Sequence, residues 1–168
     1  MSIILIRHPV VAMSGRCYGR LDVDVAPDTL AQATQTLQDH QHQPIWCSPA
    51  RRCLQLAERL SNDVTIVPAL QELDFGCWEG LSWDEIPRHE LDGWAANLWD
   101  YQVGGAESVR MLQQRVQQAF AQAKAQPNPL IWITHAGVIR TLLADLGQIA
   151  ESDRWHAPIA YATPYLVE

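Results

Sequence analysis

The chain has 168 residues, of which 48% are hydrophobic and 18% are charged, and its formal net charge is −7. The length suits one domain with a sizeable core, and the negative charge argues against a nucleic-acid binder held by a broad basic surface. No apolar run reaches the length of a membrane span or of a secretory leader. We therefore expect one domain over residues 1–168, cytoplasmic, without nucleic-acid or membrane partners.

Short apolar runs alternate with helical patterns along the chain. The runs that predict strands buried on both faces are residues 3–6, 44–47, 64–67 and 130–133. The spacing of apolar residues predicts helices over residues 28–40, 48–60, 107–126 and 138–146. Asp28 and Ser48 are the expected N-caps of the first two helices. Residues 159–167 alternate weakly and predict one or two edge strands.

Residues 71–105 lack this regular spacing. Four tryptophans stand here among acidic residues and glycines, which predicts short helices and loops. The part from about residue 81 to residue 105 is expected to be a short tryptophan-rich insert. Because strands and helices alternate elsewhere, the chain is expected to be an α/β protein, a three-layer α/β/α sandwich around a mostly parallel sheet.

Cationic and imidazole side chains follow three of the predicted strands. Arg7 and His8 follow the first strand, Arg51 and Arg52 the second, and His135 the fourth. Ligands of open α/β sheets bind beyond the carboxyl ends of the strands, so these side chains are expected to meet at one edge. The two neighbouring arginines also lie in the first turn of a helix, where a bound anion would offset their charge. The pattern predicts a phosphate site, and spacing alone leaves open which of the two points inward.

His8 has two interpretations. It is either a satisfied core histidine or a nucleophile that attacks phosphorus through a neutral ring nitrogen. The neighbouring Arg7 favours the nucleophile, because an unpaired arginine is costly in a core. Such a reaction also needs a carboxylic acid to protonate the departing oxygen. The residues by themselves leave three candidates for this acid open, namely Glu72, Asp74 and Glu79.

A metal site is the competing interpretation of the histidines. The six histidines form no H-E-x-x-H motif, and the four cysteines form no C-x-x-C pair. We therefore expect no metal.

Five short motifs follow one another along the chain. They are R-H at 7–8, S-P-A-R-R-C-L-Q-L-A at 48–57, L-Q-E-L-D-F-G-C-W-E-G at 70–80, G-G-A-E-S at 104–108 and T-H-A-G-V-I-R at 134–140. In their order they resemble the motifs of the histidine phosphatase superfamily, which includes phosphoglycerate mutases and α-ribazole phosphatases. The resemblance covers nearly the whole chain. It implies a phosphoglycerate mutase-like fold and hydrolysis of phosphomonoesters through a phosphohistidine, without a metal or an organic cofactor.

The resemblance also implies a role for each residue of the site. His8 is similar to the nucleophile of the family, and Glu72 to the group that acts first as general acid and then as base. His135 is similar to the second histidine, which donates to the transferred phosphoryl group. Arg7 and Arg52 are similar to the phosphate clamp, which selects Arg52 over its neighbour.

Some positions depart from the family motifs. Pro9, Ala106 and Ala136 replace glycines, and Pro9 removes one backbone N–H that could contact phosphate. Ala136 is still a candidate substrate contact because it follows the second histidine. The loop C-Y-G-R-L-D-V at 17–23 resembles the α-ribazole phosphatase branch, which makes Arg20 either a substrate contact or a surface arginine.

The modest insert favours a hydrolase over a mutase of the same superfamily. The favoured substrate is α-ribazole 5′-phosphate of cobalamin biosynthesis, a small-molecule phosphomonoester. Trp83, Trp94 and Trp99 either stack on the base of the leaving group or pack the insert onto the sheet. The alternatives are a broad-specificity phosphatase, a phosphoglycerate mutase-like enzyme and a non-catalytic phosphate-binding protein. The sequence leaves the oligomeric state open.

Overall fold

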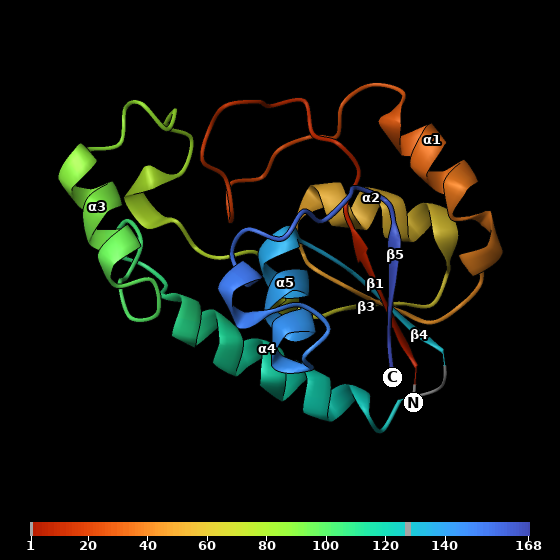
Figure 1. Ribbon diagram of the computed structural model, residues 1–168. Helices are drawn as coiled ribbons and strands as arrows, with labels where there is room; N and C mark the ends of the chain where they lie inside the picture. The colour runs from red at the N-terminus through yellow and green to blue at the C-terminus, as the bar shows by residue number, and fades with distance from the viewer. Residues whose placement is uncertain (1, 127–128) are drawn as a thin grey trace.

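Five strands form one sheet in the computed structural model, which describes residues 2–126 and 129–168 (Figure 1). The strands are β1 (Ile3–Arg7), β2 (Ile45–Cys47), β3 (Val64–Ile66), β4 (Leu130–Thr134) and β5 (Pro164–Val167). Their order across the sheet is β3-β2-β4-β1-β5, and β5 runs antiparallel to β1 while the other pairs are parallel. The four predicted strands and the edge strand of the tail are confirmed.

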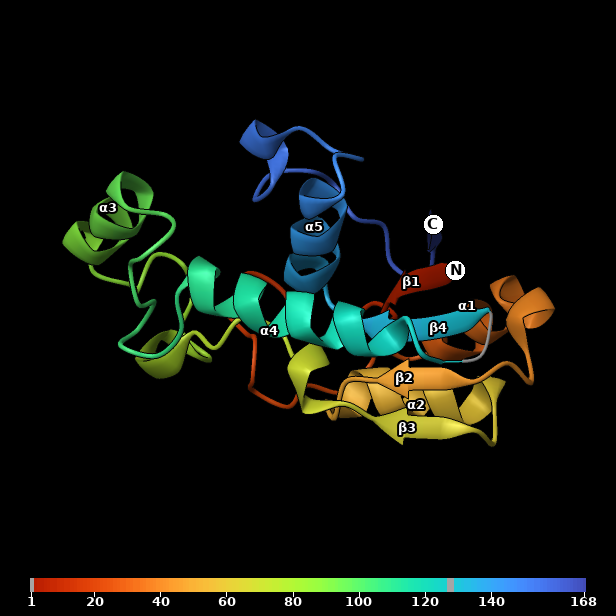
Figure 2. The ribbon, with the colours of Figure 1, turned by 90° about the horizontal axis from the view of Figure 1, so that it is seen from below.

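Helices cover both faces of this sheet (Figure 2). They are α1 (Thr29–Thr36), α2 (Arg51–Leu60), α3 (Arg88–Ala96), α4 (Val109–Ala123) and α5 (Ala136–Asp145). Short 3₁₀ helices occur at Gln38–His40, Pro68–Leu70, Gly76–Trp78 and Glu151–Asp153. Since α4 and α5 pack together on one face and α1 and α2 on the other, the expected three-layer sandwich is confirmed. No helix in the described part of the chain is long and apolar enough to cross a membrane.

The side chains of the strands alternate between two hydrophobic cores. Ile3 and Leu5 of β1 belong to the core beneath α4 and α5, whereas Ile6 belongs to the core beneath α1 and α2. In β4, Trp132 joins the first core and Ile133 the second. Because both faces of the sheet are covered, each strand is apolar throughout rather than alternately polar. This burial gives the strand ends a rigid base.

Of the two predicted N-caps, Asp28 of α1 is confirmed in its position and Ser48 of α2 is wrong. α2 begins after Ala50, later than expected, because the Ser48 hydroxyl has other partners. It accepts a hydrogen bond from the backbone N–H of Ala50 at 3.3 Å and lies 2.8 Å from the ring of His135. Asp28 does occupy the N-cap position of α1, but its φ is 65° and its side chain makes no capping hydrogen bond. The other helix ends differ from expectation by a few residues, as helix ends commonly do.

The tryptophan-rich segment forms α3 and loops, as expected, and it is held by aromatic packing. Trp78 is buried, and its indole N–H donates to Glu90 Oε2 at 2.6 Å. Trp94 of α3 stands edge-on to Trp78, Phe75 and Trp155, with ring centroids between 5.7 and 6.2 Å apart. These contacts attach α3 to the segment that follows α5.

Candidate active site

The ends of β1, β2 and β4 bring the predicted side chains to one cavity of about 200 Å³. Its lining residues are Arg7, His8, Tyr18, Arg52, Glu72, Phe75, Trp83, Trp94, His135, Ala136, Gly137, Arg140 and Trp155. Of the two neighbouring arginines, Arg52 is completely buried and Arg51 is exposed. The structure therefore brings together the histidines, the arginines and one carboxylate that the sequence singled out.

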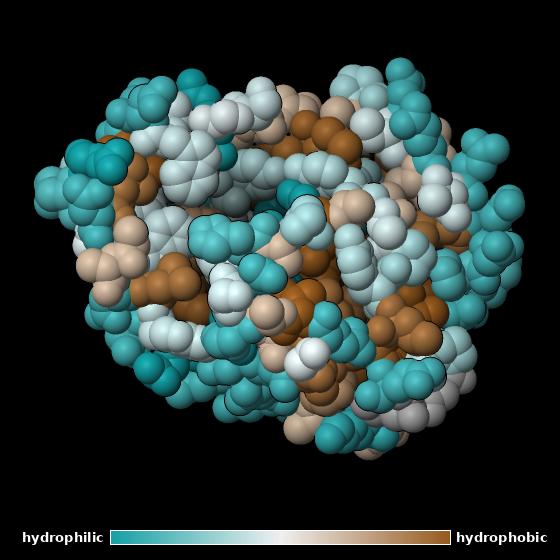
Figure 3. All heavy atoms as spheres, viewed as in Figure 1, coloured by the Kyte–Doolittle hydropathy of each residue, from teal (hydrophilic) through white to brown (hydrophobic). Residues whose placement is uncertain are grey.

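A larger hollow of about 590 Å³ lies between the C-terminal half of α5, the following loop and β5. Figure 3 shows hydrophobic side chains gathered near the centre of this face. Leu143, Ile149, Ile159 and Leu166 are among the residues that line the hollow, and none of its described lining residues is an arginine. A phosphate needs hydrogen-bond donors, so the smaller cavity is the better candidate site.

His8 is held in a form that leaves one ring nitrogen free. The ring is 2% exposed, and its Nδ1 lies 2.7 Å from the carbonyl oxygen of Pro9. A carbonyl oxygen only accepts, so Nδ1 carries the proton and Nε2 keeps its lone pair. Burial, with the charges of Arg52 and Arg7, lowers the pKa of His8 from 6.5 to about 3. The imidazole is therefore neutral and nucleophilic at any physiological pH.

His135 stands edge-on to His8, with ring centroids 5.2 Å apart. Its Nδ1 lies 3.2 Å from an Arg52 amino group and its Nε2 lies 2.8 Å from the Ser48 hydroxyl. A guanidinium only donates, so Nδ1 accepts and Nε2 donates to the serine. Burial, then the charge of Arg52, lowers the pKa of His135 well below 6.5. The site thus holds two neutral imidazoles side by side.

These two histidines are expected to make the protein less stable in acid. In the folded state their pKa values lie below 6.5, and that of His8 is about 3, so between these limits the unfolded chain binds more protons. The free energy of unfolding should fall as the pH drops below 6.5, with a slope of up to roughly 1.4 kcal/mol per pH unit per histidine. Urea unfolding of the wild type and of His8→Asn between pH 7.5 and 4.5 measures how the free energy of unfolding depends on pH. The variant should show the shallower slope, and equal slopes would contradict the assignment.

Arg52 is buried and Arg7 is half-buried, and both carry unused donors. Arg52 donates to the carbonyl oxygens of Leu21 and Gly19 at 3.0 and 2.7 Å, and Arg7 donates to the Ile159 carbonyl oxygen at 2.7 Å. The Nε of each is buried without a hydrogen-bond partner, and neither forms an ion pair with a carboxylate in residues 2–126 and 129–168. Two uncompensated guanidinium groups facing one cavity make an anion site.

Glu72 is the candidate carboxylate that lines this cavity. Its Oε1 accepts from the backbone N–H of Leu73 and its Oε2 from that of Gly137, both at 3.0 Å. A Cβ at residue 137 would overlap the carboxylate, so only glycine allows this close approach. Glu72 therefore sits against the first turn of α5, within the same cavity as the two histidines.

The other two candidate carboxylates hold the backbone instead. Asp74 Oδ1 accepts from the N–H of Gly76 at 2.9 Å. The carboxylate of Glu79 accepts four backbone N–H groups, at 2.8 to 3.1 Å, from residues 19, 20, 21 and 75. The Glu79 carboxylate therefore holds the loop whose carbonyl oxygens accept hydrogen bonds from Arg52.

The two candidate substrate contacts differ in position. Ala136 lines the cavity as the first residue of α5, and it is not among the residues with positive φ, so it fits where the family motif has glycine. Arg20 does not line the cavity. Its guanidinium donates to the carbonyl oxygen of Glu72 and to the side chain of Gln71. Among the described residues, Trp99 also lies away from the cavity, against Arg110 and Arg154.

Five residues of the cavity were not singled out as site residues from the sequence, namely Tyr18, Phe75, Gly137, Arg140 and Trp155. Arg140 follows Ala136 by one helical turn, so helical spacing places both on one face and could have revealed it. Tyr18 lies in the loop motif at residues 17–23, which drew attention only to Arg20, and Trp155 comes from a segment without regular periodicity that no sequence signal marks. Among the described residues no group of three or more His, Cys, Asp or Glu side chains is placed to hold a metal ion.

The fold and this cavity define an α/β protein with a phosphate-sized anion site beside an unprotonated imidazole nitrogen. The family model described as histidine phosphatase superfamily (branch 1) matches residues 3–168, and the chain belongs to this superfamily. The membership predicted from the five motifs is confirmed.

Known proteins of related sequence include phosphatases. The chain is 28% identical over 170 residues to an acid phosphatase of Mycobacterium tuberculosis, covering 94% of this chain and 82% of that protein. It is 30% identical over 105 residues to a 6-phosphofructo-2-kinase/fructose-2,6-bisphosphatase of Caenorhabditis elegans, covering 60% of this chain. That match takes in only 23% of the C. elegans protein, so the chain corresponds to less than a quarter of such relatives.

Solved structures share the whole fold. The crystal structure of the α-ribazole phosphatase from Shigella flexneri matches with a TM-score of 0.86 at 21% sequence identity. The match covers 100% of this chain and 90% of that one. The expected phosphoglycerate mutase-like architecture is thereby confirmed.

Proposed function

We propose that the protein hydrolyses phosphomonoesters through a phosphohistidine formed on His8. The observation that carries this proposal is the free Nε2 of a neutral imidazole that shares a cavity with the buried Arg52 and the half-buried Arg7, each with an unpartnered Nε. A non-catalytic phosphate-binding protein would need the arginines only. It would not need a nucleophilic nitrogen or a carboxylate in the same cavity.

The first half-reaction transfers the phosphoryl group to the enzyme. Nε2 of His8 attacks phosphorus and forms a P–N bond, while the P–O bond to the leaving group breaks. Glu72, as a carboxylic acid, gives its proton to the departing oxygen. Arg7 and Arg52 stabilise the negative charge on the phosphoryl oxygens, which is the largest electrostatic contribution.

The second half-reaction returns the enzyme to its starting state. Glu72, now a carboxylate, accepts a proton from water as the water attacks phosphorus, and the P–N bond breaks to release phosphate. His135 is the further donor to the phosphoryl group. Burial and then the arginine charges keep its pKa low, and a bound anion offsets the arginine charges, which favours a second proton on the ring.

The leaving group that we favour is the riboside of α-ribazole 5′-phosphate. The cavity of about 200 Å³ holds little beyond the phosphoryl group, so the rest of a substrate must lie at its rim. Phe75, Trp83, Trp94 and Trp155 are among the residues that line the cavity, and stacking of a base on an aromatic side chain contributes roughly 1–3 kcal/mol. The shared fold of the Shigella flexneri α-ribazole phosphatase agrees with this choice.

A broad-specificity phosphatase is the second candidate. The same small volume favours it, because a cavity that encloses mainly the phosphoryl group selects weakly among leaving groups.

Phosphate release from α-ribazole 5′-phosphate, 3-phosphoglycerate and a simple aryl phosphate, all in EDTA, distinguishes these candidates. We expect kcat/KM to be at least about tenfold higher for α-ribazole 5′-phosphate, on the scale of one stacked base. Similar values for all three esters would favour the broad-specificity enzyme. Activity should survive EDTA, because every step uses a side chain of the protein. Loss of activity that a divalent metal restores would contradict the mechanism.

A further inference from the structure

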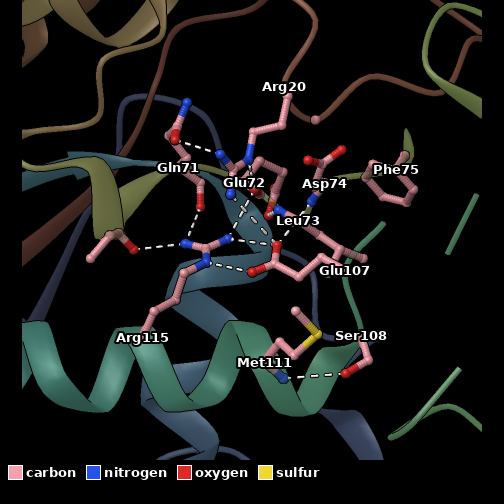
Figure 4. Close-up of polar contacts among 12 residues, drawn as sticks. Arg20, Gln71, Glu72, Leu73, Asp74, Phe75, Glu107, Ser108, Met111 and Arg115 are labelled. Atoms are coloured by element: carbon pink, nitrogen blue, oxygen red, sulfur yellow. Dashed lines mark hydrogen bonds and ion pairs between the residues drawn. The ribbon is translucent and has the colours of Figure 1, made fainter. Parts of the chain in front are cut away.

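The backbone of Glu72 is held by two arginines that come from different parts of the chain (Figure 4). Arg115 extends from α4, and Arg20 approaches from the loop that follows β1. Each donates to the carbonyl oxygen of Glu72 at 3.0 Å. A carbonyl oxygen has two lone pairs, so this oxygen has both of them occupied by guanidinium groups.

Arg115 also forms hydrogen bonds with residues that precede Glu72 in the chain. One of its amino groups donates to the carbonyl oxygens of Ala69 and Gln71 at 2.7 and 2.6 Å. Arg20 donates to the side-chain oxygen of Gln71 at 2.5 Å. Glu72 is therefore fixed together with the chain that leads into it.

Glu107 holds the backbone that follows Glu72 in the chain, and it also orients Arg115. Its carboxylate, only 8% exposed, pairs with Arg115 through two hydrogen bonds of 2.7 and 3.0 Å. The same carboxylate accepts the backbone N–H of Asp74 at 3.0 Å and lies 3.8 Å from Arg20. The five N–H groups of Arg115 thus have partners, and the segment is tied on both sides of Glu72.

This scaffold matters because residues 71–75 belong to no strand or helix. They lie between the 3₁₀ helices Pro68–Leu70 and Gly76–Trp78, and no sheet ladder sets their position. The carboxylate of Glu72 has only two backbone hydrogen bonds of its own. The position of the Glu72 carboxylate in the cavity therefore depends on contacts to the backbone around Glu72. The side chains that make these contacts do not line the cavity.

We propose that Arg20 and Arg115 are positioning residues for proton transfer by Glu72, which they hold through its carbonyl oxygen. This inference rests on the proposed function, in which Glu72 protonates the leaving group. Proton transfer requires the carboxyl group within hydrogen-bond reach of the departing oxygen, and small displacements reduce its rate steeply. Neither arginine lines the cavity proposed to hold the phosphoryl group. Arg20 therefore acts through Glu72, rather than as the substrate contact or the surface arginine between which the sequence left the choice open.

The test compares leaving groups that differ in their need for an acid. An alkyl phosphate releases an alkoxide that must be protonated, whereas 2,4-dinitrophenyl phosphate releases a stable phenolate. The value of kcat/KM reports the steps up to loss of the leaving group. For Arg115→Lys, which keeps the charge but loses the planar fork, we expect a fall of about 30-fold with the alkyl ester. With the dinitrophenyl ester the fall should be less than about threefold, because that ester needs no acid.

A double-mutant cycle tests whether the arginine acts through Glu72. In the Glu72→Gln background, Arg115→Lys should lower kcat/KM for the alkyl ester by less than about twofold, because the acid is already absent. Arg154→Lys is the matched control, since Arg154 is also enclosed and ion-paired, with 5% of its side chain exposed against 17% for Arg115, but contacts Asp145 and Glu151 rather than the segment around Glu72. Its effect should be the same for both esters.

Arg20→Met provides the same comparison if Arg115→Lys fails to fold, because Arg20 is on a loop and is 31% exposed. Equal losses on both esters, or an undiminished loss in the Glu72→Gln background, would overturn the positioning role and leave the proposed function intact. A wild-type protein that hydrolyses neither ester, or a His8→Ala variant as active as the wild type, would overturn the proposed function and this inference with it.

Discussion

Replacing His8 with alanine is expected to abolish phosphatase turnover, lowering kcat by on the order of 10⁴-fold or more, the scale for loss of a covalent nucleophile. The reason is that Nε2 of His8 is the unprotonated ring nitrogen that lies free at the arginine pair, with Nδ1 bonded to Pro9. Phosphate release from the preferred ester measures the loss. Rapid quenching in base, which preserves the P–N bond, should trap phosphohistidine in the wild type and none in the variant.

The matched control for this experiment is His89→Ala, because His89 is exposed on α3 and lies away from the cavity. Its kcat should stay within about twofold of the wild type, as surface substitutions usually do. Circular dichroism of both variants checks that they are folded. Turnover by folded His8→Ala above about 1% of the wild-type rate would assign the nucleophile elsewhere.

Replacing Arg52 with lysine is expected to lower kcat/KM by about 10²- to 10³-fold, although the charge is kept. Lysine cannot reproduce the planar fork that reaches the cavity while donating to the carbonyl oxygens of Gly19 and Leu21. The loop that carries these carbonyl groups is still fastened by the carboxylate of Glu79. The loss should therefore appear in catalysis and in weaker binding of inorganic phosphate, which calorimetry measures, more than in folding.

Arg51→Lys is the sharpest control for that result. Arg51 is the adjacent residue, but its side chain is 63% exposed and pairs with Asp24 at the surface. We expect kcat/KM of this variant within about twofold of the wild type. A loss in Arg52→Lys no larger than the loss in Arg51→Lys would show that the reaction does not specifically require the buried guanidinium of Arg52.

Much of the site could be predicted because regular elements place it. Arg7, His8 and His135 follow apolar runs that can only be buried strands, and parallel strands deliver their ends to one edge. The choice between Arg51 and Arg52 needed either the family resemblance or the structure, since both begin the same helix.

The rest depended on irregular segments. Glu72, Asp74 and Glu79 lie within eight residues of each other, and no periodicity distinguishes the one in the cavity from the two that hold backbone N–H groups. The Ser48 hydroxyl misled for a similar reason. A serine hydroxyl can either cap a helix or form a hydrogen bond with an imidazole. Only the position of His135, directly after β4, decides between these two roles.

The pairing of β1 with β5 determines where a linker, a tag or a solid support can be attached to the protein. Ile3 pairs with Val167, so both chain ends emerge side by side at one end of the sheet (Figure 1). His8 follows the opposite end of β1, about 13 Å away along the strand. A linker, an affinity tag or a solid support joined at either end would therefore extend away from the cavity, and immobilised protein would keep its pocket facing the solvent.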